Sequence, residues 1–153
     1  MQKLFGAYFY LWMSLLIAMI VGVGFIPNLG ERIIYPAHRL PLILYLYAAV
    51  AAGWVLLLCV QASLVRMANV RVHRQLGLFG CALGTTLPLI GIGTEITMNQ
   101  SHHSLGRSTN PVFFSISLND KLSFAIAFGL AMWWRRSAEY HKRLLLIATC
   151  CLV

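Results

Sequence analysis

The chain has 153 residues, of which 59% are hydrophobic and only 10% are charged. Because soluble domains carry about 25% charged residues, this composition excludes a soluble globular domain and predicts an integral membrane protein. The net charge of +8 does not indicate nucleic acid, since the basic residues lie in short segments between apolar runs. Anionic lipid headgroups are the partner that we expect for them.

Five apolar runs are expected to form helices within a single transmembrane domain, residues 1–153. A helix needs about 20 residues to cross the hydrocarbon core of a bilayer. Four runs are long enough, whereas the fifth extends only from Leu144 to Val153. The sequence therefore predicts an all-α fold, a polytopic transmembrane helix bundle with four full helices and a fifth that is truncated at the C-terminus. The expected helices are residues 4–26, 41–65, 76–98, 112–134 and 144–153.

The first run could be mistaken for a signal peptide. Its apolar character persists from Leu4 to Ile26, and no A-x-A cleavage site follows. Because a signal peptide has an apolar region of only about 7–15 residues, we expect a retained first helix. The next segment, Pro27–Arg39, carries apolar residues between charges, which predicts a short interfacial helix or a re-entrant dip.

Six residues of the third run recur at steps of three or four, which places them on one helical face. Glycines on one face allow another transmembrane helix to approach closely. We expect Gly80 and Gly84 to contact the second helix, where Ala48 and Ala52 offer small side chains, and we expect a kink at Pro88. The six residues are Gly77, Gly80, Gly84, Pro88, Gly91 and Glu95.

Three charged residues within the apolar runs are candidates for a buried polar site: Glu95, Asp120 and Lys121. If the fourth helix begins near Val112, the charges at 120 and 121 lie about 12 Å deep, where charges usually mark a polar cavity. Lys121 would then pair with Glu95 or Asp120. If the helix begins near Leu118, these charges lie at the membrane edge. A helix-pinning ion pair without transport or chemistry is the structural alternative.

Histidine beside Arg or Lys introduces an apolar run twice, in "VHRQLGLFG" (72–80) and in "YHKRLLLIA" (140–148). His73 and His141 are expected on the same side of the membrane, and His38 on the other. We favour interfacial anchoring for the pair, with haem b or quinone binding and proton handling as the alternatives. The adjacent histidines in the expected loop 99–111 are weak metal candidates, and no metal site is predicted.

The basic residues predict an orientation. With the N-terminus in the cytoplasm, eight Lys and Arg residues lie on the cytoplasmic side and three on the opposite side, as the positive-inside rule requires. Trp133 and Trp134 are expected to form an aromatic anchor at the same edge. The candidates for contact with lipid headgroups are Arg74, Arg135, Arg136, Lys142 and Arg143.

The stretches "AGWVLLLCVQASLV…VRVHRQLGLFG" (52–80) and "EYHKRLLLIAT" (139–149) resemble an uncharacterised family of small bacterial multi-pass membrane proteins. The resemblance covers about residues 41–149. It implies a bacterial inner membrane and a chain that continues beyond the H-K-R-L helix, but no activity. Tyr47 departs from the family, in which a histidine commonly opens the second helix. The matching residues are Trp54, Gln61, His73, Arg74, Leu76, Gly77, His141, Lys142 and Arg143.

Three functions stay open at this point. The first is a structural or accessory transmembrane subunit of a larger respiratory or photosynthetic complex, because the chain is small, has a glycine face and lacks a substrate motif. The second is a haem- or quinone-binding redox protein that uses His73 and His141. The third is a small transporter or proton-linked sensor that uses Glu95, Asp120 and Lys121. No catalytic residues are predicted, and lipids and other transmembrane subunits are the expected partners.

Overall fold

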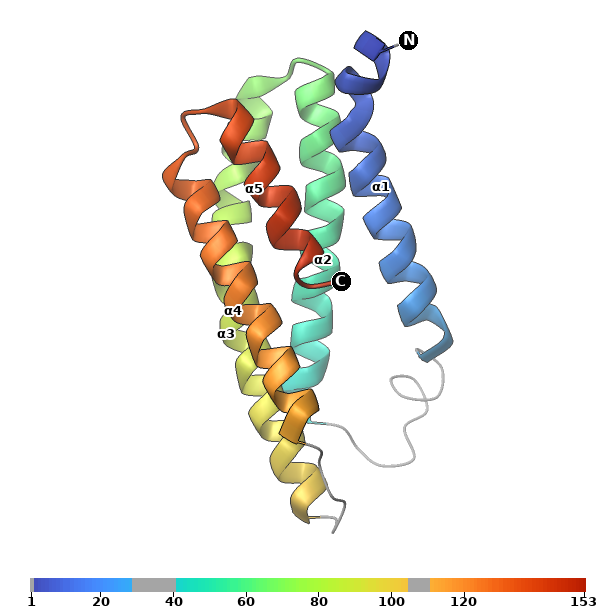
Figure 1. Cartoon of the computed structure of the whole chain (residues 1–153), viewed down its shortest axis with the longest axis vertical. Helices are drawn as coiled ribbons and strands as arrows, with labels where there is room; N and C mark the ends of the chain where they lie inside the picture. Colours follow the sequence, from blue (N-terminus) through green and yellow to red (C-terminus); the bar gives the residue numbers. More distant parts are fainter. Residues whose placement is uncertain (1, 29–40, 105–110) are drawn as a thin grey trace.

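The computed structural model describes residues 2–28, 41–104 and 111–153, and these residues form an all-α bundle (Figure 1). No strand occurs within those ranges. The predicted fold class is therefore confirmed. The helices are α1 Gln2–Asn28, α2 Leu42–Arg66, α3 Val70–Ser104, α4 Pro111–Trp133 and α5 Ala138–Cys150.

Four of these helices are long and apolar enough to cross a membrane. Their outward faces carry large apolar side chains such as Trp12, Leu42 and Leu78. Such a surface is costly in water but suits the hydrocarbon interior of a bilayer. The chain is thus an integral, multi-pass membrane protein. The four candidate spans are Tyr8–Phe25, Leu42–Arg66, Val70–Ser101 and Val112–Trp133.

Helix α3 is longer at both ends than the predicted 76–98. It begins at Val70, where the Asn69 side chain caps the helix by accepting a hydrogen bond from the Val72 amide at 3.4 Å. It continues to Ser104, so the first part of the predicted loop 99–111 is helical. Hydropathy marks only the apolar part of a helix, whereas backbone hydrogen bonding extends past it.

Helix α5 also begins earlier than predicted, at Ala138 instead of Leu144. Glu139 lies in its first turn, where a negative charge is favoured by the helix dipole. The helix ends at Cys150, about halfway along the bundle (Figure 1), and therefore covers only one half of its neighbours. We refer to this half, which contains the turns at 67–69 and 134–137, as the α5 half.

In the α5 half the helices form a closed ring. Extended contacts join α1 to α2, α2 to α3, α3 to α4 and α4 to α5, and a much smaller contact from α5 back to α1 closes the ring. The interior is filled by an aromatic core of Trp54, Phe124 and Phe128, in which the Trp54 ring meets the two phenyl rings edge-on at 5.4 and 5.5 Å. The Trp54 indole also donates a hydrogen bond to the Thr149 hydroxyl at 3.2 Å, which ties α2 to α5.

The glycine face of α3 points into this bundle. It contacts two helices, whereas contact with α2 alone was expected. A β-carbon on Gly80 would lie 3.1 Å from Leu57 of α2, as expected, whereas one on Gly84 would overlap the ring of Phe128 in α4. Gly84 therefore packs closely against another helix, as expected, but this helix is α4 and not α2. Because α3 lies between α2 and α4, successive turns of a single face meet different neighbours.

Candidate functional site

Lys121 is buried in the central turns of α4. Its side chain is 7% exposed, and its ammonium lies 3.4 Å from a carboxylate oxygen of Glu95 in α3. The helix begins at Pro111, so Lys121 lies about 15 Å along it. Of the two expected positions for this charge, the edge position near a helix start at Leu118 is therefore wrong, and the interior position is the one observed.

Three acceptors surround the Lys121 ammonium. They are the Glu95 carboxylate at 3.4 Å, the Ser117 carbonyl oxygen at 3.2 Å and the Ser117 hydroxyl oxygen. The Ser117 hydroxyl in turn donates to the same Glu95 oxygen. An ammonium has three N–H donors, so these three acceptors can satisfy all of them. We call Glu95, Ser117 and Lys121 the polar triad.

The two charges of the triad differ in access. The Glu95 side chain is 32% exposed, whereas that of Lys121 is almost closed off. Glu95 is therefore the more accessible end of the triad. Asp120 is half-buried and forms no ion pair within the described residues, so the expected alternative pairing of Lys121 with Asp120 is not observed.

Gly91 of α3 lies against the Lys121 side chain, and a larger residue would not fit at this position. A β-carbon there would lie 2.8 Å from Cε of Lys121 and 3.0 Å from the Tyr47 ring. The Tyr47 ring itself lies 5.9 Å from the Lys121 ammonium, within the range of a cation–π contact. The triad is therefore enclosed by α2, α3 and α4, and Gly91 provides the space through which the lysine side chain passes.

His73 and His141 both lie at the end of the bundle opposite the polar triad, and both are half-buried. His141 contacts the Ala131 carbonyl through Nδ1 at 2.8 Å. Gln61 donates to the His73 carbonyl at 3.3 Å, while Nδ1 of His73 and Oε1 of Gln61 are buried without a partner. The interfacial anchoring that we favoured from the sequence stays a prediction. His38 lies outside the described residues.

The basic residues at the same end fall into two groups. Lys142 and Arg143 pair with the Glu139 carboxylate, and the hydrogen bond from Lys142 is the main reason why the pKa of Glu139 is lowered. Arg74, Arg135 and Arg136 are exposed. Among the described residues, these three arginines form no ion pair, so their charges are available for contact with lipid headgroups.

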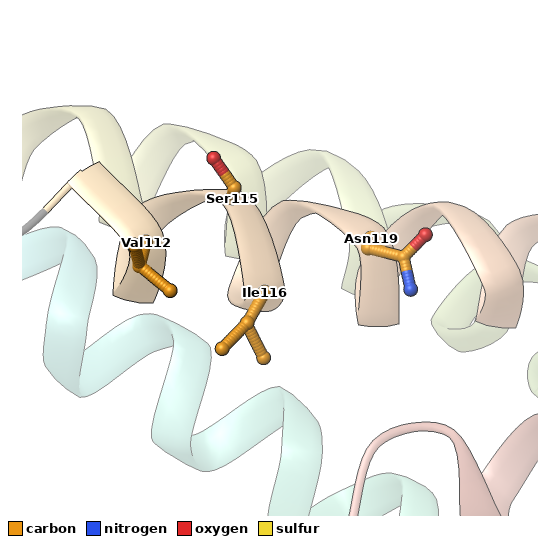
Figure 2. Close-up of a pocket in the computed structure, with 4 residues that line it drawn as sticks. All are labelled: Val112, Ser115, Ile116 and Asn119. Atoms are coloured by element: carbon orange, nitrogen blue, oxygen red, sulfur yellow. The ribbon is translucent and has the colours of Figure 1, made fainter.

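A shallow depression lies on the outer part of α4 (Figure 2). It has a volume of about 440 Å³ and is lined by Val112, Ser115, Ile116 and Asn119. Val112 and Ile116 point toward α2 in this view. These residues recur at steps of three and four on a face of α4 that does not include Ser117 or Lys121. The depression is therefore separate from the polar triad.

Sequence reasoning identified both charges of the triad but missed Ser117 and Tyr47. Ser117 precedes Lys121 by four residues, so helical spacing places the two on one face, and this signal was available. Tyr47 was noted only as a departure from a family pattern. Its place beside Gly91 depends on how α2 packs on α3, which no local pattern specifies.

Comparison with protein-family models, with curated proteins and with solved structures found no match for this chain. The geometry therefore defines its class without a relative: an all-α, multi-pass membrane protein with a buried charged triad in its interior. Within the described residues no group of three or more His, Cys, Asp or Glu side chains is placed to hold a metal ion.

Proposed function

We propose that this chain is a proton-linked membrane protein, a small transporter or sensor, in which Glu95 exchanges the proton and Lys121 responds to it. The supporting observation is the burial of the Lys121 ammonium against Ser117 and a partly accessible Glu95 carboxylate. Ionisable groups at such a depth are costly to keep, and in membrane proteins they commonly mark ion pathways or proton relays.

The response follows from the loss of a counter-charge. Two opposite charges about 4 Å apart attract by roughly 4 kcal/mol at an effective dielectric constant of 20. When Glu95 takes up a proton, this attraction disappears, and the Lys121 ammonium keeps only neutral acceptors, the Ser117 oxygens and the carbonyl oxygen of the protonated carboxyl group. The lysine side chain is then held less firmly against Glu95. This change weakens the connection between α3 and α4.

The expected role as an accessory subunit of a larger respiratory or photosynthetic complex is the competing proposal. It is supported by the apolar side chains on every outward helix face, which suit neighbouring subunits as well as lipid. In that case the triad only pins α3 to α4. An ion pair of this kind can often be replaced by apolar residues without loss of stability, which separates the two proposals.

Infrared difference spectroscopy on the purified full chain in liposomes tests the proton-linked role. A pH jump should produce the carbonyl band of a newly protonated carboxyl group. Glu95→Gln should abolish this band, and the neighbouring Asp120→Asn variant serves as the matched control that retains it. A band that survives in Glu95→Gln and disappears in Asp120→Asn would refute the role given to Glu95.

The double variant Glu95→Gln, Lys121→Met distinguishes the accessory role. If the triad only joins two helices, this variant should fold, and it should co-purify with its partner subunits as the wild-type chain does. If the chain is proton-linked, the double variant should fold but show no pH-dependent change in Trp54 fluorescence. A wild-type chain whose fluorescence is independent of pH would favour the accessory subunit.

A further inference from the structure

The Lys121 ammonium faces a second partner besides the carboxylate, the ring of Tyr47 in α2. The ring centroid lies 5.9 Å from the ammonium, at the outer limit of about 6 Å for a cation–π contact. The Glu95 carboxylate is closer, at 3.4 Å. A full negative charge attracts an ammonium more strongly than the quadrupole of a ring does, so the lysine stays with α3 while Glu95 is charged.

The lysine stem and the Tyr47 ring meet beside Gly91 of α3. A β-carbon on Gly91 would lie 2.8 Å from Cε of Lys121 and 3.0 Å from Cε2 of Tyr47. The two side chains therefore reach the same space from α4 and from α2. Because glycine has no side chain, nothing at position 91 stands between the lysine stem and the ring.

The groups around Lys121 limit where its ammonium can turn. In the part of the chain that the structure describes, the titratable side chains in contact with it are Glu95 of α3 and Tyr47 of α2. Ser117 adds neutral oxygen acceptors from α4 itself. Once Glu95 is protonated, the Tyr47 ring is the contact that links the ammonium to a helix other than α3 and α4.

We propose that Tyr47 positions the Lys121 ammonium when Glu95 is protonated, so that the lysine turns from the carboxyl group in α3 to the ring face in α2. This inference rests on the proton-linked role proposed above and names the residue through which the lysine responds. A ring face attracts the charge of a cation without occupying a particular N–H donor. The ammonium can therefore keep the Ser117 oxygens while it approaches the ring.

The turn of the lysine strengthens the connection between α2 and α4. These two helices already meet in the aromatic core, where the Trp54 and Phe124 rings lie edge-on at 5.4 Å. Tyr47 precedes Trp54 by about two helical turns, and Lys121 precedes Phe124 by about one. Protonation of Glu95 thus loosens α3 from α4 and adds a contact between α2 and α4 beside the aromatic core.

The test is an infrared titration of the purified full chain in liposomes, with the Glu95 carboxyl band as the readout. An attractive ring stabilises the state in which Glu95 is protonated, so a ring that repels the ammonium should move the midpoint of the band to lower pH. Tyr47→Phe keeps the ring face and should leave the midpoint unchanged. Pentafluorophenylalanine at position 47 keeps the shape of phenylalanine but reverses its quadrupole, and it should lower the midpoint by about one pH unit.

Two controls separate this effect from changes in packing. Pentafluorophenylalanine at position 45 replaces a tyrosine that lies about 200° around α2 from Tyr47, and it should leave the midpoint unchanged. In the Lys121→Met background, phenylalanine and pentafluorophenylalanine at position 47 should give equal midpoints. Circular dichroism of each variant confirms that it is folded.

The outcomes distinguish this proposal from the one on which it rests. A wild-type chain without a Glu95-dependent band overturns the proton-linked role, and the role of Tyr47 with it. A band whose midpoint is the same with phenylalanine and pentafluorophenylalanine at position 47 overturns the role of Tyr47 alone. A difference that persists in the Lys121→Met background also overturns it, because the ring would then act on Glu95 directly.

Discussion

Each side chain of the polar triad depends on the others, because Lys121 is almost completely enclosed. Glu95→Gln leaves the ammonium without its counter-charge, and removal of one partner of a buried pair costs about 3–5 kcal/mol. Since the Glu95 side chain is about one-third exposed, solvent screening reduces this cost. We therefore expect a loss of about 2 kcal/mol in the free energy of unfolding, which denaturant titration in detergent would measure.

The stability of the double variant should be compared with that of Glu95→Gln alone. Lys121→Met added to Glu95→Gln removes the unpaired charge, and the chain should regain most of its stability. The coupling energy from the double-mutant cycle should therefore be clearly different from zero. Additive losses from the two single substitutions would mean that Glu95 and Lys121 do not interact in the folded protein.

Gly91 is the residue that admits the lysine side chain. Gly91→Ala should push Lys121 and Tyr47 apart, because the new β-carbon would lie 2.8 Å from Cε of Lys121. Overpacking of this kind typically costs about 1–3 kcal/mol. The matched control is Gly129→Ala in α4, where no atom lies within 4 Å of the new β-carbon. Thermal unfolding in detergent should lower the melting temperature of the first variant only.

At the scale of a helix, a second, compensating substitution can show which helix packs against Gly84. Gly84→Leu should disrupt the bundle, because small-residue contacts depend on close van der Waals approach. The overlapping atoms belong to Phe128 of α4. Phe128→Ala should therefore restore part of the lost folding yield, whereas Leu57→Ala in α2 should not. Rescue by Leu57→Ala instead would place Gly84 against α2.

The helices themselves were largely predictable from the sequence, but their ends and neighbours were not. Hydropathy located the centres of all five helices, because apolar length alone decides whether a segment can span a bilayer. It missed the polar first turns of α3 and α5, including His73 and Glu139, where backbone hydrogen bonds and capping decide the boundary. The choice of α4 as the neighbour of Gly84 depends on how whole helices pack.

On the scale of the whole molecule, the interior has two polar regions separated by an aromatic core. The triad lies in the half of the bundle beyond the end of α5, and the histidine pair lies where five helices form a closed ring. The sequence pattern predicted Glu95, Lys121 and both histidines, but it missed Ser117. It could not predict which helices α5 would pack against, since that depends on the turn at 134–137, which folds α5 back onto α4.

The orientation in the membrane is the last prediction. Asn69 in the α2–α3 turn and Ser137 in the α4–α5 turn lie at one end of the bundle, and α3 carries Ser104 to the other end (Figure 1). In a chain whose native cysteines are replaced, Asn69→Cys and Ser137→Cys should react with a membrane-impermeant thiol reagent from the cytoplasmic side, because the basic residues cluster there. Ser104→Cys should react only from the opposite side. Labelling of Asn69→Cys and Ser104→Cys from the same side would contradict the crossing of the membrane by α3.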